Sequence, residues 1–158
     1  KWFLEWCNDE FAHGEAFALI MRSDPKLLSG VNKLWIRVFL LAVYSTMYVR
    51  DHSRPKLYEA FGMDVTEFDY TVFDITTEIS RQVFPLTLNT DDPRFRAGLE
   101  RMRALQVARD ALEGQRGPVA TLKKLGYMVG SGLTFARLFL LPTHANTIPD
   151  QVRMQPAW

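Results

Sequence analysis

The chain contains little cysteine, and this scarcity limits the chemistry that it can hold. Among its 158 residues, Cys7 is the single cysteine. An internal disulfide and a Cys-x-x-Cys metal or redox motif are therefore both excluded. The absence of disulfides is typical of a reducing compartment, and we interpret Cys7 as a small packing residue.

The chain also lacks a dominant charge and several familiar motifs. Its 19 Lys and Arg residues nearly balance its 18 Asp and Glu residues, which leaves a net charge of +1. This balance argues against nucleic acid as a partner. The sequence has no Gly-x-Gly-x-x-Gly, P-loop or Gly-x-Ser-x-Gly pattern, so neither a nucleotide site nor a hydrolase nucleophile is predicted.

Long apolar runs and strand-like alternation are missing as well. The apolar stretch 38–44 is too short to cross a membrane, and Arg37 and Arg50 bracket it closely. Alternation of apolar and polar residues never extends beyond a few positions, which argues against a sheet. Because 47% of the residues are apolar, the chain can still pack a core. The predicted fold class is all-α, in a single domain over residues 1–158.

Proline, glycine and capping residues divide the chain into expected helices. Asn32 is expected to cap a central buried helix, Pro85 to end the next long one, and Asp92-Pro93 to begin another. The expected helices cover residues 1–21, 32–50, 57–61, 68–84, 94–113 and 119–141. The predicted apolar stripe of the helix 68–84 is Val72, Ile75, Ile79, Val83 and Leu86. The prolines after residue 141 predict an extended tail over residues 142–158.

The first helix carries the strongest chemical signal, a carboxylate and an imidazole within an apolar seam. The seam residues, spaced three and four apart, are Phe3, Trp6, Glu10, His13, Phe17 and Ile20. This spacing is typical of a helix packed against other helices. Burying an unpaired carboxylate costs several kcal/mol, and a metal ion would remove that cost. Glu-x-x-His on an inward helix face is the unit of di-iron sites in helical bundles, so Glu10 and His13 are candidate metal ligands.

Two further carboxylates are candidate site residues, and each has an alternative interpretation. Asp9 could orient a metal-bound imidazole through a hydrogen bond, or it could be an ordinary solvated residue. Glu78 could face the same interior as Glu10, although a local ion pair with Arg81 three residues later is favoured. Glu10 and His13 could also neutralise each other by hydrogen bonding without any metal.

Three further segments are interpreted by their charge and hydropathy. His52 is expected to be a helix C-terminal cation or a surface residue. The arginine-rich helix 94–113 is interpreted as a solvated face, with a docking surface for an acidic partner as the alternative. The last helix is expected to pack closely against a neighbour or to lie on a membrane surface, and the charge of Arg137 within it argues against spanning.

Several separate blocks of the sequence closely resemble one protein family. The first block, Trp6–Phe17, contains Asp9-Glu10-Phe11-Ala12-His13. The other blocks are Asn32–Arg37, Met47–His52, Glu78–Thr87 and Leu133–Arg137, and the resemblance continues to Trp158. The chain resembles the aerobic (oxidative) magnesium-protoporphyrin IX monomethyl ester cyclases of chlorophyll and bacteriochlorophyll synthesis.

The resemblance implies a ferritin-like di-iron helical bundle with additional C-terminal helices. It implies that Glu10 and His13 are iron ligands and that Asp9 supports them. The family pattern has two Asp-Glu-x-Arg-His motifs, of which this chain has one, so the other ligands are expected upstream of Lys1. The chain also begins within a helix pattern and without a cap, and we expect it to be the C-terminal portion of a longer protein. Ala12 stands where the family has Arg, and the missing arginine could weaken an ion pair or a contact with the substrate.

The resemblance further implies oxygen-dependent formation of the fifth, isocyclic ring, which converts the Mg-porphyrin ester to divinyl protochlorophyllide. The expected cofactors are two Fe ions, with electrons delivered from NADPH through a reductase or ferredoxin. The expected partners are the Mg-porphyrin, dioxygen and an electron-donor protein. An auxiliary cyclase subunit is a further candidate partner. The expected location is cytoplasmic, with peripheral association at the photosynthetic membrane.

Two other function classes remain open from the residues alone. A homodimeric ferritin-like iron-binding protein would complete the metal site across a two-fold axis, using Glu10, His13 and Glu78 of each chain. A metal-free helical scaffold would leave Glu10 and His13 paired with each other.

Overall fold

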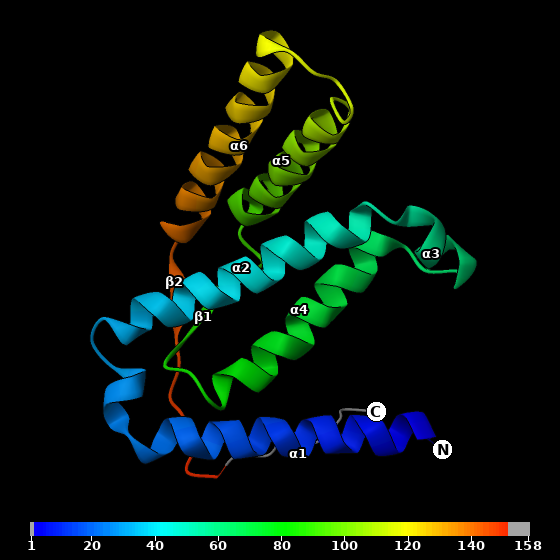
Figure 1. Ribbon diagram of the computed structural model, residues 1–158. Helices are drawn as coiled ribbons and strands as arrows, with labels where there is room; N and C mark the ends of the chain where they lie inside the picture. The colour runs from blue at the N-terminus through cyan, green and yellow to red at the C-terminus, as the bar shows by residue number, and fades with distance from the viewer. Residues whose placement is uncertain (1, 152–158) are drawn as a thin grey trace.

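The computed structural model describes the backbone of residues 2–151 and the side chains of residues 13–151 (Figure 1). Its elements follow in the order α1 (Trp2–Ser23), η1 (Pro25–Leu28), α2 (Asn32–His52), α3 (Pro55–Ala60), α4 (Val65–Arg81), β1 (Leu86–Leu88), α5 (Pro93–Asp110), α6 (Pro118–Phe139) and β2 (Thr143–Ala145). The prediction of an all-α fold is confirmed, with one small two-stranded sheet added to it.

Local capping explains where several helices begin. The Asp92 carboxylate accepts a hydrogen bond of 2.8 Å from the Arg94 backbone N–H, directly before Pro93 at the start of α5. Asp64 caps α4 in the same way through the Glu67 N–H. These side chains satisfy backbone donors that lack a partner inside the helix. The prediction that Asn32 caps α2 is wrong, because Asn32 is already helical and its amide donates to the Lys26 carbonyl.

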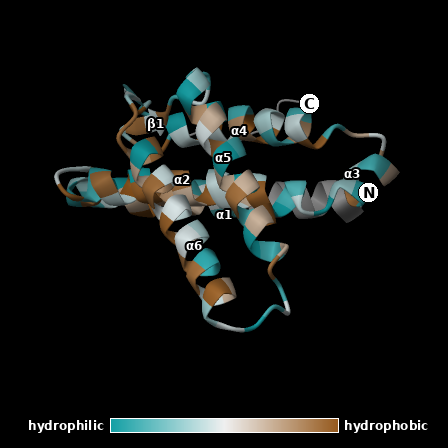
Figure 2. Ribbon diagram, turned by 90° about the horizontal axis from the view of Figure 1, so that it is seen from above, coloured by the Kyte–Doolittle hydropathy of each residue, from teal (hydrophilic) through white to brown (hydrophobic). Residues whose placement is uncertain are grey.

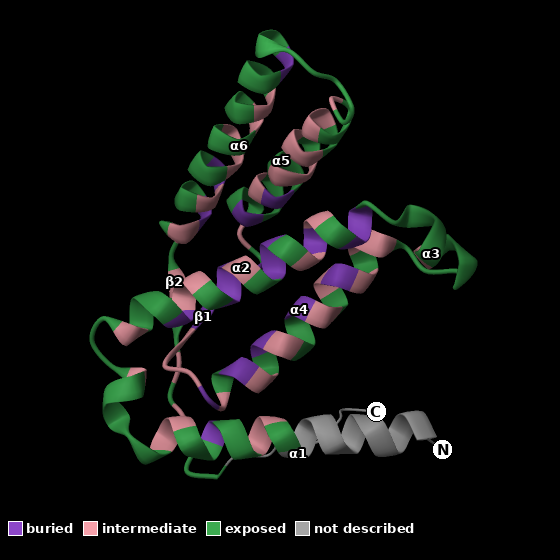
Figure 3. Ribbon diagram, in the orientation of Figure 1, coloured by how far each residue is buried: buried purple, intermediate pink, exposed green. Residues whose placement is uncertain are grey.

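The core is centred on α2 (Figure 3). The expectation of a central helix buried over the stretch 38–44 is only partly correct, because Phe39 is 69% exposed and Val43 is 55% exposed. The buried core residues from α2 are Ile36, Leu40, Leu41, Tyr44 and Tyr48, and from the rest of the chain Phe73, Leu88, Phe95, Leu99 and Leu138. The helix α2 therefore contacts α4, α5 and α6, and it forms the support for the other elements.

The buried face of α4 differs from the predicted stripe. The residues that α4 buries are Asp69, Phe73, Thr77 and Ser80, whereas Ile75 is 39% exposed. Phe73 stacks on Tyr44 of α2 with ring centroids 4.5 Å apart. The Tyr44 hydroxyl also lies 3.1 Å from the Thr77 hydroxyl. These two contacts fix the rotation of α4 about its axis, and they turn the apolar residues of the predicted stripe partly outward.

The strands β1 and β2 close the α5–α6 hairpin at its base. They pair antiparallel, with Leu86 opposite Ala145 and Leu88 opposite Thr143. The Asn146 N–H continues the pairing to the Pro85 carbonyl at 3.0 Å. The chain thus leaves the core before α5 and returns to the same place after α6 (Figure 1).

The helices α5 and α6 cross closely at Gly98. A Cβ atom at Gly98 would lie 2.3 Å from Cδ2 and 2.8 Å from Cγ of the buried Leu138 side chain. Only a residue without a side chain fits this crossing unless Leu138 moves. Gly126, which also lies inside α6, has no atom within 4 Å of such a Cβ.

These two glycines give a matched prediction about stability. We expect Gly126→Ala to raise the free energy of unfolding by up to about 1 kcal/mol, because alanine favours the helix. We expect Gly98→Ala to lower it by about 1 kcal/mol, because the overpacking cost of about 1–3 kcal/mol exceeds that gain. Denaturant unfolding of both variants measures the difference, and equal stabilisation of both would contradict the close crossing.

Candidate metal centre

The helix α1 carries the candidate ligands. Because residues 2–23 form one continuous helix, residues three apart in it project to the same side. Glu10 and His13 therefore share a helix face. The side chains of Asp9 and Glu10 lie outside the described residues, as do those of Phe3 and Trp6. The His13 side chain is described, and it is exposed.

The described part of the α1 seam, from His13 to Ile20, is largely exposed. Phe17 is 68% exposed and Ile20 is 59% exposed, whereas Ala18 is fully buried against Val83. The prediction that Phe17 and Ile20 are buried is therefore wrong for this chain by itself. Figure 3 shows the mixed exposure along the second half of α1. His13 thus lies exposed on the same face of α1 as two large apolar side chains, which we call the open face of α1.

Glu78 lies on the surface of α4. Its carboxylate accepts a hydrogen bond of 2.6 Å from Arg81, so the favoured local ion pair is confirmed. Among the residues whose side chains are described, no group of three or more His, Cys, Asp and Glu residues is arranged to hold a metal ion. The described part of the chain therefore does not compose a metal site by itself, and the role of Glu78 as a ligand stays a prediction.

An apolar cavity of about 510 Å³ lies between the end of α1, α2 and α4. Trp35, Phe39 and Val43 of α2 line it, together with Met21 of α1 and Phe84. Phe39 is 69% exposed and Trp35 is 59% exposed, although both are large and apolar. Exposed apolar patches of this kind mark surfaces that contact another molecule or segment. The cavity thus reaches the C-terminal end of α1 through Met21.

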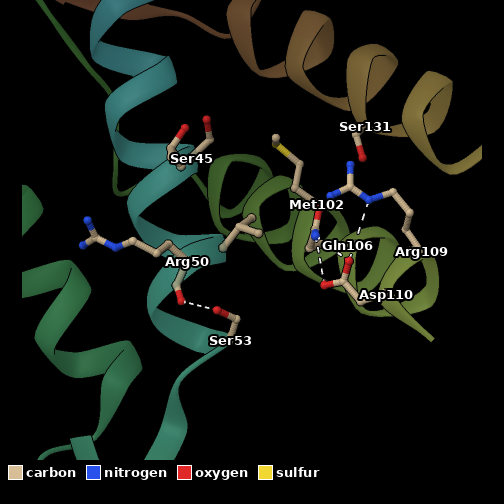
Figure 4. A pocket seen from close by; sticks show the side chains of 10 residues that line it. Ser45, Arg50, Ser53, Met102, Gln106, Arg109, Asp110 and Ser131 are labelled. Atoms are coloured by element: carbon tan, nitrogen blue, oxygen red, sulfur yellow. Dashed lines mark hydrogen bonds and ion pairs between the residues drawn. The ribbon is translucent and has the colours of Figure 1, made fainter. Parts of the chain in front are cut away.

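A polar pocket of about 390 Å³ separates α2 from the α5–α6 hairpin (Figure 4). Gln106 donates to Asp110 at 2.7 Å, and the Ser53 hydroxyl donates to the Arg50 carbonyl. Arg109 lies 3.8 Å from the same Asp110 carboxylate. The polar groups that line this pocket are mostly hydrogen-bonded to one another or to the backbone, so they offer little to a ligand.

The structure also shows a buried ionisable cluster where α2 ends and α4 begins. It consists of Asp51, His52 and Asp69, which are 3%, 8% and 0% exposed. His52 ends α2, as expected, but it is buried, so the alternative of a surface residue is wrong. Its Nδ1 lies 2.9 Å from the Tyr48 carbonyl and 3.3 Å from the Asp69 carboxylate, and its Nε2 lies 3.0 Å from the Thr66 hydroxyl. Because a carbonyl can only accept, Nδ1 carries the proton.

The two carboxyl groups of this cluster have opposite pKa shifts. Burial raises the pKa of Asp69 to about 7, and the negative charge of Asp51 adds to the rise. Burial also acts on Asp51, but hydrogen bonds with Arg50 and Tyr58 outweigh it and hold the pKa of Asp51 below its ordinary value. The Arg50 Nε lies 2.5 Å from Asp51. The buried Asp69 carboxyl therefore holds its proton to a much higher pH than an ordinary aspartic acid does.

Sequence reasoning missed this cluster because its members come from two helices. Asp69 lies four residues before Phe73 and eight before Thr77, so helix periodicity places all three on one face. A stripe drawn through Phe73 instead of Ile75 would have included a carboxylate. This stripe was the sequence signal that could have revealed the buried carboxylate. A buried acid needs a partner, such as His52.

Comparisons with known proteins cover the whole chain. It is 53% identical over all 158 residues to a protein of Rubrivivax gelatinosus named aerobic magnesium-protoporphyrin IX monomethyl ester [oxidative] cyclase. It is 39% identical over 157 residues to the corresponding cyclase of Synechococcus sp. (strain WH7803) and 41% identical over 154 residues to that of Gloeobacter violaceus. Each of these two matches covers 97% of the chain.

The chain spans less than half of these relatives, namely 44% of the Rubrivivax and Synechococcus proteins and 43% of the Gloeobacter protein. No protein-family profile matches the chain. No solved structure matches it either. Within the described residues, no helix is long and apolar enough to cross a membrane.

Proposed function

Because this chain belongs, over the part that it spans, to the family of magnesium-protoporphyrin IX monomethyl ester (oxidative) cyclases, we propose that a protein containing it forms the isocyclic ring of chlorophyll or bacteriochlorophyll. The observation that carries this proposal is the 53% identity over all 158 residues to a protein of that name. The reaction is the oxygen-dependent conversion of Mg-protoporphyrin IX monomethyl ester to divinyl protochlorophyllide.

In this proposal α1 supplies one carboxylate and one imidazole, Glu10 and His13, to a di-iron centre. The one-helix arrangement of the two residues and their spacing support it, as does the pairing of such units in ferritin-like bundles. Oxygen and nitrogen donors suit iron, and Asp9 is placed to orient a metal-bound imidazole. The described residues do not complete the centre, so the other ligands come from the remaining length of the relatives.

The open face of α1 has a structural role in the same proposal. His13, Phe17 and Ile20 lie exposed on it, and three apolar or ligand side chains at these spacings are typical of a helix–helix interface. Helices from the rest of a cyclase would cover this face, exclude water from His13 and complete a ferritin-like bundle. The Ala12 position then matters less for ligation than for contacts at the border of the interface.

When bound, iron would supply the activation of dioxygen. The chain's own residues would hold the metal through a carboxylate and an imidazole, and the Asp9 carboxylate would fix the imidazole orientation. We further propose NADPH as the ultimate electron source, through a reductase or ferredoxin, and peripheral association at the photosynthetic membrane. An auxiliary cyclase subunit belongs to the same proposal.

The test compares this 158-residue chain with a protein extended to the full length of the relatives. We expect the extended protein to bind two iron ions and to consume Mg-protoporphyrin IX monomethyl ester in the presence of oxygen and a reductant. We expect the chain by itself to bind little iron and to catalyse nothing, because most donors are absent and metal affinity depends on the complete ligand set. Metal analysis and pigment chromatography measure both outcomes.

Two results would contradict the proposal. If the extended protein holds iron but leaves the ester unchanged, the proposed cyclase activity is wrong. Tight stoichiometric iron in the chain by itself, together with a dimeric mass, would instead favour the homodimeric iron-binding protein, for which the open His13 face provides a two-fold interface.

A further inference from the structure

A groove between α5 and α6 combines positive charge with an apolar floor. It encloses about 340 Å³, and its arginines are Arg94 and Arg101 of α5 and Arg137 of α6. Ala97 and Leu138 are among the apolar residues that line it. The close crossing at Gly98 brings the two helices together and so sets the groove between them. The groove lies away from α1 and its candidate metal ligands (Figure 1).

Two of these guanidinium groups are available for a ligand. Arg94 pairs with Asp92 at 2.7 Å. Within the described residues, no hydrogen bond or ion pair occupies the guanidinium groups of Arg101 and Arg137, and both residues are exposed. The carboxylate of Glu100, the residue before Arg101 in α5, is already engaged by Tyr48 and Arg103. The groove therefore has excess positive charge.

Arginine in this arrangement favours a particular class of ligand. A guanidinium group presents a planar fork of N–H donors that matches the oxygens of a phosphate or a carboxylate. Two such forks from different helices can hold one oxyanion between them. The Ala97 and Leu138 side chains cannot bond to an oxyanion, but they can contact an apolar group attached to it.

The surface beside the groove extends the apolar contact. Leu133 lies on α6 four residues before Arg137, and Leu140 directly follows α6, three residues after Arg137, with helical φ and ψ angles. Both therefore lie on the same side as Arg137. Leu133 is 58% exposed and Leu140 is 77% exposed. The outward face of α6 continues with Leu122, Leu125 and Val129, all more than half exposed. Figure 2 shows hydrophobic residues in brown along α6.

We propose that this groove is a binding site for an amphipathic anion, that is, a phosphate or carboxylate group attached to an apolar body. Arg101 and Arg137 bind the oxyanion, and the apolar body lies over Ala97, Leu133 and Leu140. The ligand has two possible sources with the same chemistry, a lipid headgroup in a membrane surface and a soluble amphiphile. The site does not depend on the proposed cyclase activity.

The experiment uses the full-length protein and two probes. The soluble probe is dodecyl phosphate below its micelle concentration, followed by isothermal titration calorimetry. The membrane probe is cosedimentation with vesicles of phosphatidylglycerol, compared with vesicles of neutral phosphatidylcholine. We expect dodecyl phosphate to bind, and Arg101→Gln and Arg137→Gln each to weaken its binding by at least about 10-fold, because each removes charge-assisted hydrogen bonds.

Control variants separate the groove from general charge. Arg54→Gln removes another exposed arginine, directly before α3, and should leave binding unchanged. Ala97→Phe keeps every charge but fills the groove, and it should abolish binding of dodecyl phosphate. Because Ala97 is exposed, this variant is expected to fold, and circular dichroism checks that it does.

The outcomes test whether the groove binds an amphipathic anion and whether that anion is a lipid or a soluble molecule. Loss of phosphatidylglycerol binding in the Arg101→Gln/Arg137→Gln double variant supports the site with a lipid as its source. Groove-dependent binding of dodecyl phosphate without vesicle binding supports the site with a soluble ligand. Absence of dodecyl phosphate binding to the unmodified protein would overturn the proposal. Equal binding by the unmodified protein and the double variant, or equal loss in Arg54→Gln, would overturn it as well.

Discussion

Replacing His13 with alanine is expected to reduce cyclase turnover by more than about 100-fold in the full-length protein. Loss of a group that merely orients a metal ligand costs about 10–100-fold in affinity or activity, and a ligand itself should cost more. Glu10→Ala should have the same effect, because the two residues share one face of α1. Both variants should also lose iron, which metal analysis measures independently of turnover.

A second histidine provides the matched control for this prediction. His144 lies exposed on β2, and His144→Ala should retain iron and turnover. In the 158-residue chain, where the His13 side chain is exposed, His13→Ala should leave the helix content unchanged. Full activity and full iron content in the His13→Ala protein would show that His13 is not a ligand.

Replacing Asp69 with asparagine is expected to flatten the pH dependence of stability. The pKa of Asp69 is raised to about 7 in the folded protein, against about 3.9 in an unfolded chain. Between these values the folded state binds more protons than the unfolded state, so stability falls as the pH rises. From about pH 5 to about pH 8, Asp69 should remove on the order of 2 kcal/mol from the free energy of unfolding.

The Asp69→Asn variant should lack this loss because an amide does not titrate. Its geometry resembles the protonated acid, since the amide N–H₂ can donate to Asp51 and the amide oxygen can accept from His52. Denaturant unfolding at both ends of this pH range measures the difference. Asp74→Asn, a change at an exposed position of the same helix, should keep the original pH dependence. An Asp69→Asn protein with that same dependence would contradict the buried proton.

Local signals allowed much of the helical organisation to be predicted from the sequence. Asp92 and Pro93 define the start of α5 through contacts within three residues, and such contacts do not depend on the rest of the fold. The rotation of α4 could not be predicted in this way. It depends on Tyr44, which lies on another helix and stacks on Phe73.

The same distinction applies to the ionisable residues. The Glu10–His13 spacing can be read from a single helix, and so can the Glu78–Arg81 pair. The burial of His52 could not be read, because Asp69 lies 17 positions away and on a different helix. Likewise, the spacing of the α1 seam indicates an interface but does not say which segment of a protein covers it.

The hairpin base formed by β1 and β2 has a consequence for engineering the molecule. Since both ends of the hairpin meet at this strand pair, its far loop can change in length without altering the path of the chain through the core. Gly114 and Gly117 in that loop have positive φ angles, and a Cβ atom at either position would meet no other atom within 4 Å. Exposed loop tips of this kind tolerate insertions. The loop is therefore a suitable position for a fluorescent label or an affinity tag, distant from α1.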